Sequence, residues 1–147
     1  MIEANVEIEN KFWIKELKIP KKYFTPKLSK IRKIIKFFKK KNIIFSICLT
    51  NSLNVKKLNK KFRKKNKPTD ALAFPFYTLK YLKMKKEKKI YIGDIAVSYE
   101  IIKSRSKNNN FFTEFDKVWV HALLHLIGYN HIRNKDFFIM QSIEKKI

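Results

Sequence analysis

The three histidines of this chain all fall within eleven residues, as His121, His125 and His131. Residues four apart on a helix lie one turn apart on the same face, so a helix through this segment brings the imidazoles of His121 and His125 together. Gly128 ends such a helix, because glycine readily adopts the left-handed conformation that follows a helix C-terminus. The resulting turn lets His131 approach the other two. The segment therefore predicts a long helix from about residue 113 to 127 that carries a three-histidine site.

Three neutral imidazoles form a zinc ligand set that leaves the fourth tetrahedral position open to water, as in catalytic sites. A structural zinc site is instead closed by four protein ligands, usually including cysteine. The chain has one cysteine, Cys48, in the apolar segment 43–49 and far from the histidines in sequence. We therefore expect one catalytic Zn²⁺ per chain, bound by His121, His125 and His131, although three imidazoles also suit copper, nickel or iron.

The histidine spacing equals that of the long zinc-protease signature, but the general base of that signature is missing. Ala122 occupies the position where those proteases carry glutamate, so peptide hydrolysis would lack its proton acceptor and a divergent metallopeptidase is a disfavoured alternative. Phosphodiester hydrolysis suits the site better, because zinc brings bound water to a pKa of about 7 and an arginine can stabilise the phosphoryl charge. Arg63 is the candidate, since a guanidinium binds phosphate through two hydrogen bonds.

The charge of the chain bears on its partner. Lysine and arginine total 35 against 12 acidic residues, a net charge of +23, which favours RNA, DNA or an anionic membrane surface as partner. Lysine, isoleucine, asparagine, phenylalanine and tyrosine, all with A/T-rich codons, fill 82 of the 147 positions. Mutational drift in an A/T-rich genome therefore explains the excess equally well, and the charge alone does not decide between the two.

Three features of the sequence indicate the cellular compartment. The first ten residues carry three glutamates and no lysine, the reverse of a signal peptide. No apolar run approaches the ~18 residues that span a bilayer. One cysteine excludes an internal disulfide, and Cys48 is expected to be a buried, inert thiol. We expect a soluble protein of the reducing cytoplasm, without membrane contact and of undetermined oligomeric state.

The N-terminal half predicts alternating strands and helices. Residues 2–9 alternate between apolar and polar side chains, the period of a strand with an acidic outer face. A strand over 43–49 and a helix capped by Asn51 come later. Between the strands predicted at 2–9 and 43–49, Thr25 and Pro26 offer an N-cap and a first-turn proline for a helix. Its apolar stripe follows at helical spacing: Leu28, Ile31, Ile34, Ile35 and Phe38.

The C-terminal half continues the pattern. Residues 71–78 predict a strand that Pro75 confines to a sheet edge or a bulge, the lysine-rich segment 80–89 predicts a loop, and 90–97 a further strand. Ser98 can cap a short helix that ends at about 108–110, before the histidine helix. A final helix is expected after Asn134, with an inner stripe of Phe137, Met140, Ile143 and Ile147. We expect one α+β domain, 1–147, with a small mixed sheet packed with helices.

Several motifs together resemble one known family. The segment that ends the histidine helix matches the motif H-G-x-L-H-L-x-G-Y-D-H at His121, Leu124, His125, Leu126, Gly128, Tyr129 and His131. Two further segments agree in order and spacing: Arg63 followed by Pro68-Thr69-Asp70-Ala-Leu-Ala-Phe74-Pro75, and Gly93-Asp94-Ile95. The tail Met140-x-x-x-Glu144 also agrees. Over roughly residues 43–147 the chain resembles the bacterial YbeY family of endoribonucleases.

This resemblance implies a zinc-dependent endoribonuclease that prefers single-stranded RNA. Its implied roles are maturation of the 3′ end of 16S ribosomal RNA and quality control of the 70S ribosome, with ribosomal RNA and the small subunit as partners. His121, His125 and His131 carry over as zinc ligands, and Arg63 as the basic residue of the active-site cleft, so that Arg63 and His121 are the candidate catalytic residues. Two positions depart from the motif: Ala122 replaces Gly, and Asn130 replaces Asp beside the third ligand.

Several other residues have both a functional and a structural interpretation. Asp94 could orient a ligand or form a turn, and Glu114 could be a base or a solvated residue at a helix start. Tyr129 and Phe74 could stack on bases of single-stranded RNA, although core packing is the stronger interpretation for Phe74. The alternative function is a non-catalytic ribosome- or RNA-associated protein in which the metal is structural.

Overall fold

Alternating side chains build the first strand, as predicted. The computed structural model describes residues 1–129, 141–142 and 144–146. β1 (Ile2–Ile8) turns its even-numbered, apolar side chains towards the core and leaves Glu3 and Glu7 exposed. It pairs in parallel with β2 (Asn42–Thr50), the predicted apolar strand. One face of β2 is fully buried, through Ile43, Phe45, Ile47 and Leu49.

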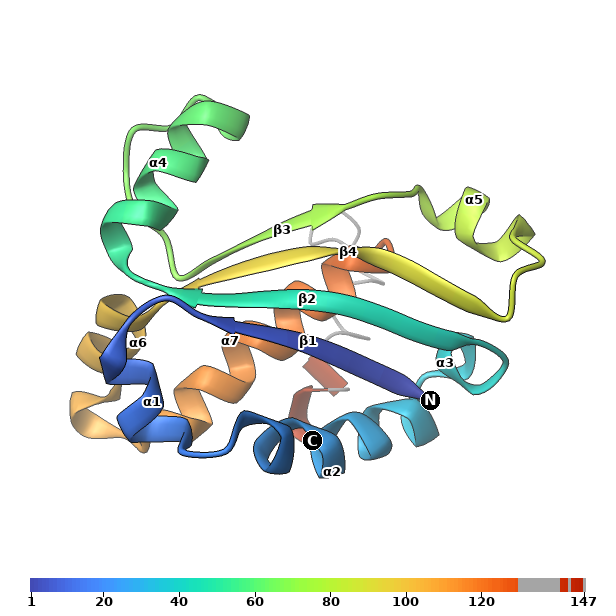
Figure 1. The fold of residues 1–147 in the computed structure, drawn as a ribbon, viewed down its shortest axis with the longest axis horizontal. Coiled ribbons are helices and arrows are strands. Elements are labelled where there is room, and N and C mark those ends of the chain that lie inside the picture. The colour runs from blue at the N-terminus through green and yellow to red at the C-terminus, as the bar shows by residue number, and fades with distance from the viewer. Residues whose placement is uncertain (130–140, 143, 147) are drawn as a thin grey trace.

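The sheet is mixed and four-stranded, in the order β1-β2-β4-β3 (Figure 1). β4 (Lys89–Ser98) runs parallel to β2, and β3 (Ala71–Pro75) runs antiparallel to β4. β3 is an edge strand, and Pro75 is its last residue, where the missing N–H costs no ladder bond. The predicted α+β class and edge position are both confirmed.

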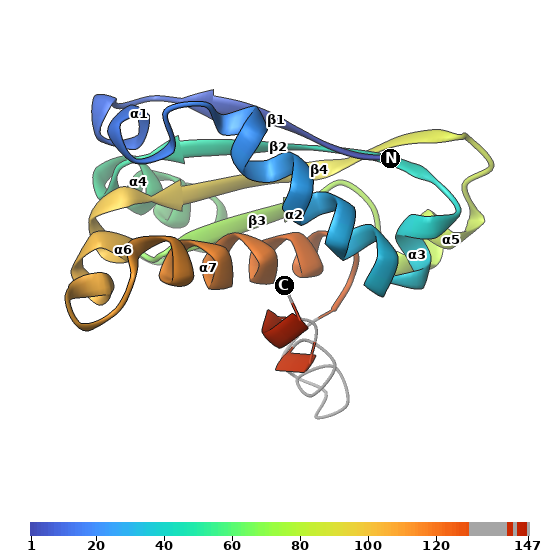
Figure 2. The ribbon, with the colours of Figure 1, turned by 90° about the horizontal axis from the view of Figure 1, so that it is seen from below.

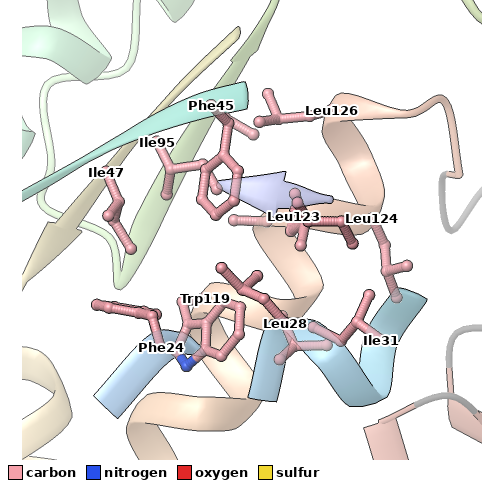
Figure 3. Close-up of a cluster of buried hydrophobic side chains, with 14 of the residues drawn as sticks. Phe24, Leu28, Ile31, Phe45, Ile47, Ile95, Trp119, Leu123, Leu124 and Leu126 are labelled. Atoms are coloured by element: carbon pink, nitrogen blue, oxygen red, sulfur yellow. The ribbon is translucent and has the colours of Figure 1, made fainter. Parts of the chain in front are cut away.

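Helices cover the sheet unequally. The described helices are α1 (Lys11–Leu17), α2 (Pro20–Ile34), α3 (Lys36–Lys39), α4 (Ser52–Arg63), α5 (Leu79–Met84), α6 (Tyr99–Arg105), a 3₁₀ turn (Ser106–Asn108) and α7 (Phe111–Leu126). Figure 2 shows α2 and α7 under the sheet. α4 contacts β3 and β4 through a separate apolar cluster of Val55, Leu72 and Ala96. Figure 3 shows where the side chains of α2, α7 and the sheet meet: Phe24, Leu28, Ile31, Phe45, Ile47, Ile95, Trp119, Leu123, Leu124 and Leu126.

Several predicted boundaries were wrong. The strand predicted over 71–78 ends at Pro75, and the helix whose apolar stripe was expected to reach Phe38 is interrupted at Ile35, between α2 and α3. The helix expected to begin at Thr25 and Pro26 begins at Pro20, so Pro26 lies inside α2. Both prolines are compatible with a helix start, but only the earlier start places Phe24 in the core, where it is 1% exposed. The lysine-rich segment expected to be a loop contains α5, which is held by the buried side chain of Leu82.

Helix caps follow the sequence in most places. Asn51 caps α4 by accepting a hydrogen bond from the Asn54 amide at 2.8 Å, as predicted. Ser98 does precede α6, but its side chain does not cap it. The Ser98 hydroxyl is instead buried and shares a 2.8 Å hydrogen bond with Ser52. The Ser98 side chain therefore links β4 to α4 instead of capping α6.

The predicted histidine helix is α7. Asn110 caps it by accepting from the Phe112 amide at 2.8 Å, and it ends at Leu126. Gly128 follows with a φ of +97°, the left-handed conformation expected at this position. The prediction of this helix and of its glycine end is confirmed.

Asp116 ties α7 to α2. Its carboxylate accepts from the Tyr23 hydroxyl at 2.5 Å, the Lys27 ammonium at 2.6 Å and the Trp119 indole at 2.9 Å. Burial, followed by the hydrogen bond and charge of Asp116, raises the pKa of Tyr23 well above its ordinary value. The helix that carries the histidines is thus held in place by a charged network as well as by the core.

The final helix was predicted from Phe137, Met140, Ile143 and Ile147, which lie outside the described residues. The described residues of that segment, 141–142 and 144–146, are helical. No helix within the described ranges is both long enough and apolar enough to cross a membrane.

Candidate active site

α7 brings two of the histidines together. Nε2 of His121 lies 3.0 Å from Nε2 of His125, and their ring centroids are 4.6 Å apart. The four-residue spacing places both rings on one face of the helix, and the two Nε2 atoms point at each other rather than into solvent. His131, the third predicted ligand, lies outside the described residues.

This arrangement fits a tetrahedral metal ion. With metal–nitrogen bonds of about 2.0–2.1 Å, two nitrogen ligands of a tetrahedral zinc ion lie about 3.3 Å apart. The 3.0 Å separation of the Nε2 atoms of His121 and His125 is close to that value. The donor set therefore suits zinc, and the role of these histidines as ligands stays a prediction.

Glu144 orients one of the imidazoles. Its Oε1 lies 3.0 Å from Nδ1 of His121. A carboxylate can only accept, so Nδ1 carries the proton and Nε2 keeps the lone pair that a metal needs. A carboxylate behind a histidine is a recurrent partner of metal ligands. From the sequence, Glu144 was noted only as part of a matching tail, because the contact spans 23 residues.

The histidines line an open cavity of about 630 Å³ between β3 and α7. β3 contributes Ala71, Ala73 and Pro75 to its lining, while α7 contributes Val118 and Ala122 beside the histidines. The side chain of His121 is 30% exposed. Solvent and a substrate can therefore reach the imidazoles, as a catalytic site requires and a closed structural metal site does not.

Arg63 lines the same cavity, opposite the histidine helix. It is the last residue of α4, and its guanidinium donates to the Ala73 carbonyl of β3 at 3.3 Å. α4 ends at Arg63 because the next residue, Lys64, has a φ of +57° that turns the backbone away from the helix. Arg63 is thereby left at the cavity. The structure thus places together three of the four predicted site residues, Arg63, His121 and His125.

The other cations of the cavity are paired. Arg105 donates to the Asp70 carboxylate at 2.6 Å, and Lys117 lies 3.5 Å from the Glu114 carboxylate. Within the part of the chain that the structure describes, no carboxylate lies within ion-pair distance of Arg63. Arg63 is therefore the cavity cation whose charge is most available to an anionic group.

Asp70 and Arg105 were not singled out as site residues. Asp70 was part of the matching Thr69-Asp70 segment, and its Oδ1 accepts from the Ala71 amide at 2.7 Å at the start of β3. Arg105, on α6, had no signal among so many basic residues. Only the fold brings the two side chains to the same cavity.

Glu114 and Tyr129 both line the cavity, whereas Phe74 does not. The Glu114 side chain is 17% exposed and accepts from Asn109 at 2.9 Å, so it is not the solvated residue that its place at a helix start suggested. Phe74 packs against the small cluster of Val55 and its neighbours on the opposite face of the sheet, as the core interpretation predicted.

Asp94 lies away from the histidines. It was expected either to orient a ligand or to form a turn, but it lies inside β4 beside a register irregularity. Its carboxylate accepts from the Tyr91 hydroxyl, and it lines a separate cavity on the opposite face of the sheet. Burial and then this hydrogen bond raise the pKa of Tyr91. Asp94 therefore forms no turn, and it lines a different cavity from His121 and His125.

Cys48 is half-buried rather than buried, and it lies near Glu7 and Glu9. Their potential ligand atoms are within 4.8 Å of one another, which makes them a candidate metal-binding group on the far side of the sheet from the histidines. Burial, then the hydrogen bond and charge of Glu9 and the charge of Glu7, raises the pKa of Cys48 to about 12. A thiol that holds its proton so firmly is a poor metal ligand, in keeping with the predicted inert thiol.

Comparison with known proteins identifies the family. The family model described as "Endoribonuclease YbeY" matches residues 7–147. The chain belongs to the YbeY endoribonuclease family. A YbeY endoribonuclease of Pelagibacter ubique is 43% identical over 140 residues, covering 93% of this chain and 88% of that protein. One of Buchnera aphidicola is 39% identical, covering 88% of this chain and 79% of that protein.

A solved structure agrees with the family assignment. The solution structure of TM1509 from Thermotoga maritima superposes with a TM-score of 0.57 at 25% identity, covering 99% of this chain and 88% of that one. The resemblance seen from the motifs of residues 43–147 therefore extends over nearly the whole chain, including β1 and the first helices.

Proposed function

We propose that this chain is a zinc-dependent endoribonuclease that cleaves single-stranded RNA, acting as one domain over residues 1–147. The observation that carries the proposal is the pair of converging Nε2 atoms of His121 and His125, one of them oriented by Glu144, in an open cavity that also contains Arg63. Family membership supplies RNA as the substrate class. His131 completes the proposed ligand set.

The residues of the cavity divide the work of phosphodiester hydrolysis. Zinc, when bound, supplies a Lewis acid and an activated water. His121 and His125 hold it through Nε2, and Glu144 keeps His121 in the tautomer that binds metal. Arg63 donates to non-bridging phosphate oxygens and stabilises the charge that grows on them during attack. Asp70 and Glu114 are engaged with Arg105 and Lys117, so neither competes with phosphate for Arg63.

The alternative of a structural metal in a non-catalytic RNA-associated protein fits this cavity less well. A metal whose task is to hold the fold is best closed off by four protein ligands. Here the two histidines border about 630 Å³ of open space. A protease is disfavoured on separate grounds, because Ala122, beside His121, lines the cavity where a carboxylate would be needed.

The cellular role follows from the family resemblance. We propose that the substrate is ribosomal RNA in the cytoplasm, with the chain acting in maturation of the 16S 3′ end and in 70S ribosome quality control, in contact with the small subunit. The net charge of +23 supports binding to RNA phosphates, and the absence of an apolar spanning helix among the described residues is compatible with this location.

The test is cleavage of a labelled single-stranded RNA by the purified protein and by His125→Ala prepared in parallel. Wild type is expected to cleave, to lose activity with a chelator and to regain it with zinc, whereas the variant is inactive. Circular dichroism and zinc content of the variant separate loss of catalysis from loss of fold, and His125→Gln provides a second, more conservative removal of the ligand. Equal activity in wild type and a folded variant contradicts the proposal, because the cleavage would then not depend on His125.

A further inference from the structure

A group of exposed apolar side chains lies just beyond the catalytic cavity. Among large hydrophobic residues, Phe76 is 56% exposed, Tyr81 52% and Met84 69%. They belong to α5 and to the turn that joins it to β3. Soluble proteins rarely leave such side chains together on the surface unless something binds there. We call Phe76, Tyr77, Tyr81 and Lys85 the aromatic platform.

The rings of the platform form one continuous surface. The Tyr77 and Tyr81 rings stack at 5.1 Å and 24°, and Tyr77 meets the edge of Phe76 at 6.5 Å. The ammonium of Lys85 lies 4.3 Å from the Tyr77 ring centroid and 5.3 Å from that of Tyr81. Lys85 therefore adds a positive charge to an already assembled stack of rings.

The platform is anchored rather than frayed. Leu82 of α5 is fully buried, and the Thr78 hydroxyl caps the helix by accepting from the Tyr81 amide at 3.3 Å. At the other end of α5, the Lys41 ammonium donates to the carbonyls of Leu82 and Lys85. A short helix held at both ends and through its buried face keeps its exposed rings at fixed positions. A preformed surface of this kind binds without first paying an ordering cost.

The platform continues the line of the cavity. β3 lines the cavity as far as Pro75. Phe76 follows and packs against Tyr91 at 5.1 Å, towards the other face of the sheet, whereas Tyr77 packs against the main core. Gly128, which also lines the cavity, packs so closely on α5 that a Cβ there would lie 2.7 Å from the Cβ of Leu79. Figure 1 shows α5 beyond the end of β3. A chain that leaves the cavity past Gly128 therefore reaches α5 at Leu79, which lies in sequence between the stacked rings of Tyr77 and Tyr81.

The charge around the platform suits a polyanion. Segment 76–89 contains one acidic residue, Glu87, against six lysines: Lys80, Lys83, Lys85, Lys86, Lys88 and Lys89. Aromatic rings beside lysines are the combination that binds single-stranded nucleic acid, because bases stack on the rings while the ammonium groups meet the phosphates.

We propose that the aromatic platform binds bases of single-stranded RNA that flank the cleaved phosphodiester on the Pro75 side of the cavity. The inference rests on the proposed function for its ligand class and adds to it a second point of contact outside the cavity. Stacking is indifferent to base identity, so the platform contributes affinity and positioning rather than sequence preference. An anionic membrane surface is the competing occupant of an exposed, basic, aromatic helix.

The test compares Tyr81→Ala with wild type in binding and cleavage of oligouridylates of about four and about sixteen nucleotides, the lower and upper limits of comparable binding sites. Binding is followed by fluorescence anisotropy with a chelator present, so that cleavage does not interfere. The variant is expected to bind the long RNA about tenfold more weakly and the short RNA as well as wild type does. Tyr81→Trp, which keeps a stacking surface, is expected to stay close to wild type on both.

The matched control is Phe12→Ala, which removes an aromatic side chain of similar exposure, 47%, from α1. Thermal unfolding of each variant shows whether the fold is intact. Equal affinity of wild type and folded Tyr81→Ala for the long RNA overturns the platform while leaving the proposed function in place, provided wild type still cleaves. Unchanged RNA affinity together with weaker binding to phosphatidylglycerol vesicles assigns the surface to a membrane instead. Failure of wild type to bind or cleave either RNA overturns both proposals.

Discussion

Nδ1 of His121 lies 3.0 Å from the carboxylate of Glu144, which comes from the C-terminal helical segment. Glu144→Gln replaces the carboxylate by an amide, which is a weaker hydrogen-bond acceptor for Nδ1 of His121. The imidazole is then less firmly oriented, and its Nε2 lone pair is a weaker donor to a metal. We expect zinc affinity to fall by about 10- to 100-fold, as is typical when the partner of a metal-binding histidine is lost. Competition with a chromogenic chelator measures this affinity.

The control for Glu144→Gln is Glu16→Gln, which alters a carboxylate that is hydrogen-bonded to Tyr99 but remote from the cavity. Its zinc affinity should equal that of wild type. If Glu144→Gln also binds zinc normally, the carboxylate does not support the metal site, and its contact with His121 only fastens the C-terminal segment.

Arg63 is expected to act on phosphate rather than on the metal. Arg63→Ala should lower cleavage of single-stranded RNA by about 100-fold, comparable to the loss of one donor from an oxyanion site, while zinc content stays unchanged. Arg63→Lys keeps the charge but loses the two-pronged hydrogen bond, so it should fall between the two. Loss of zinc from Arg63→Ala, measured by elemental mass spectrometry, would contradict the assignment of Arg63 to phosphate.

Local patterns were sufficient where one element decides the outcome. The two-residue alternation of β1 and the glycine after α7 depend on near neighbours, and both predictions hold. Pro75 restricts its strand to an edge whatever surrounds it, because proline has no N–H to donate. The same locality placed His121 and His125 on one helix face, with their Nε2 atoms 3.0 Å apart.

Local patterns were insufficient where tertiary contacts choose between equal alternatives. Pro20 and Pro26 can both begin a helix, and burial of Phe24 selects the first. The role of Glu144 depends on a segment folding back over 23 residues, and Arg105 reaches Asp70 from another helix. Sequence periodicity does not predict such long-range contacts, so the partners of Glu144 and Asp70 became known only from the fold.

The Asp116 network predicts a large loss of stability. Asp116→Ala removes the acceptor of three hydrogen bonds and leaves the buried Trp119 indole and the Tyr23 hydroxyl without their partner. We expect the free energy of unfolding to fall by about 2–4 kcal/mol, since an unsatisfied buried donor costs roughly 1–3 kcal/mol. Urea denaturation measures this change, with Glu3→Ala on the exposed face of β1 as the control. A loss below about 1 kcal/mol would mean that the apolar contacts alone hold α7 to α2.

Gly128 couples stability to the metal site. Its φ of +97° strains any side chain, and an added Cβ would lie 2.7 Å from the Cβ of Leu79. Gly128→Ala is therefore expected to cost at least about 1 kcal/mol in thermal unfolding, and to weaken zinc binding because His131 follows three residues later. Ser104→Ala, on the exposed surface of α6, controls for substitution itself. Normal zinc affinity in Gly128→Ala would show that the turn can relax without moving the proposed third ligand.

The raised pKa of Cys48 predicts slow reaction with thiol reagents. A shift from 9.0 to about 12 keeps the thiol protonated at pH 8 and lowers its thiolate fraction by about a thousandfold relative to an unfolded chain. Reaction with an aromatic disulfide reagent at pH 8 should therefore be much slower in the native protein than in urea. Burial is the largest cause and Glu9 the next, so Glu9→Gln should react faster than wild type. Equal rates in Glu9→Gln and wild type would show that Glu9 does not contribute, and would leave burial and the charge of Glu7 as the sources of the protection.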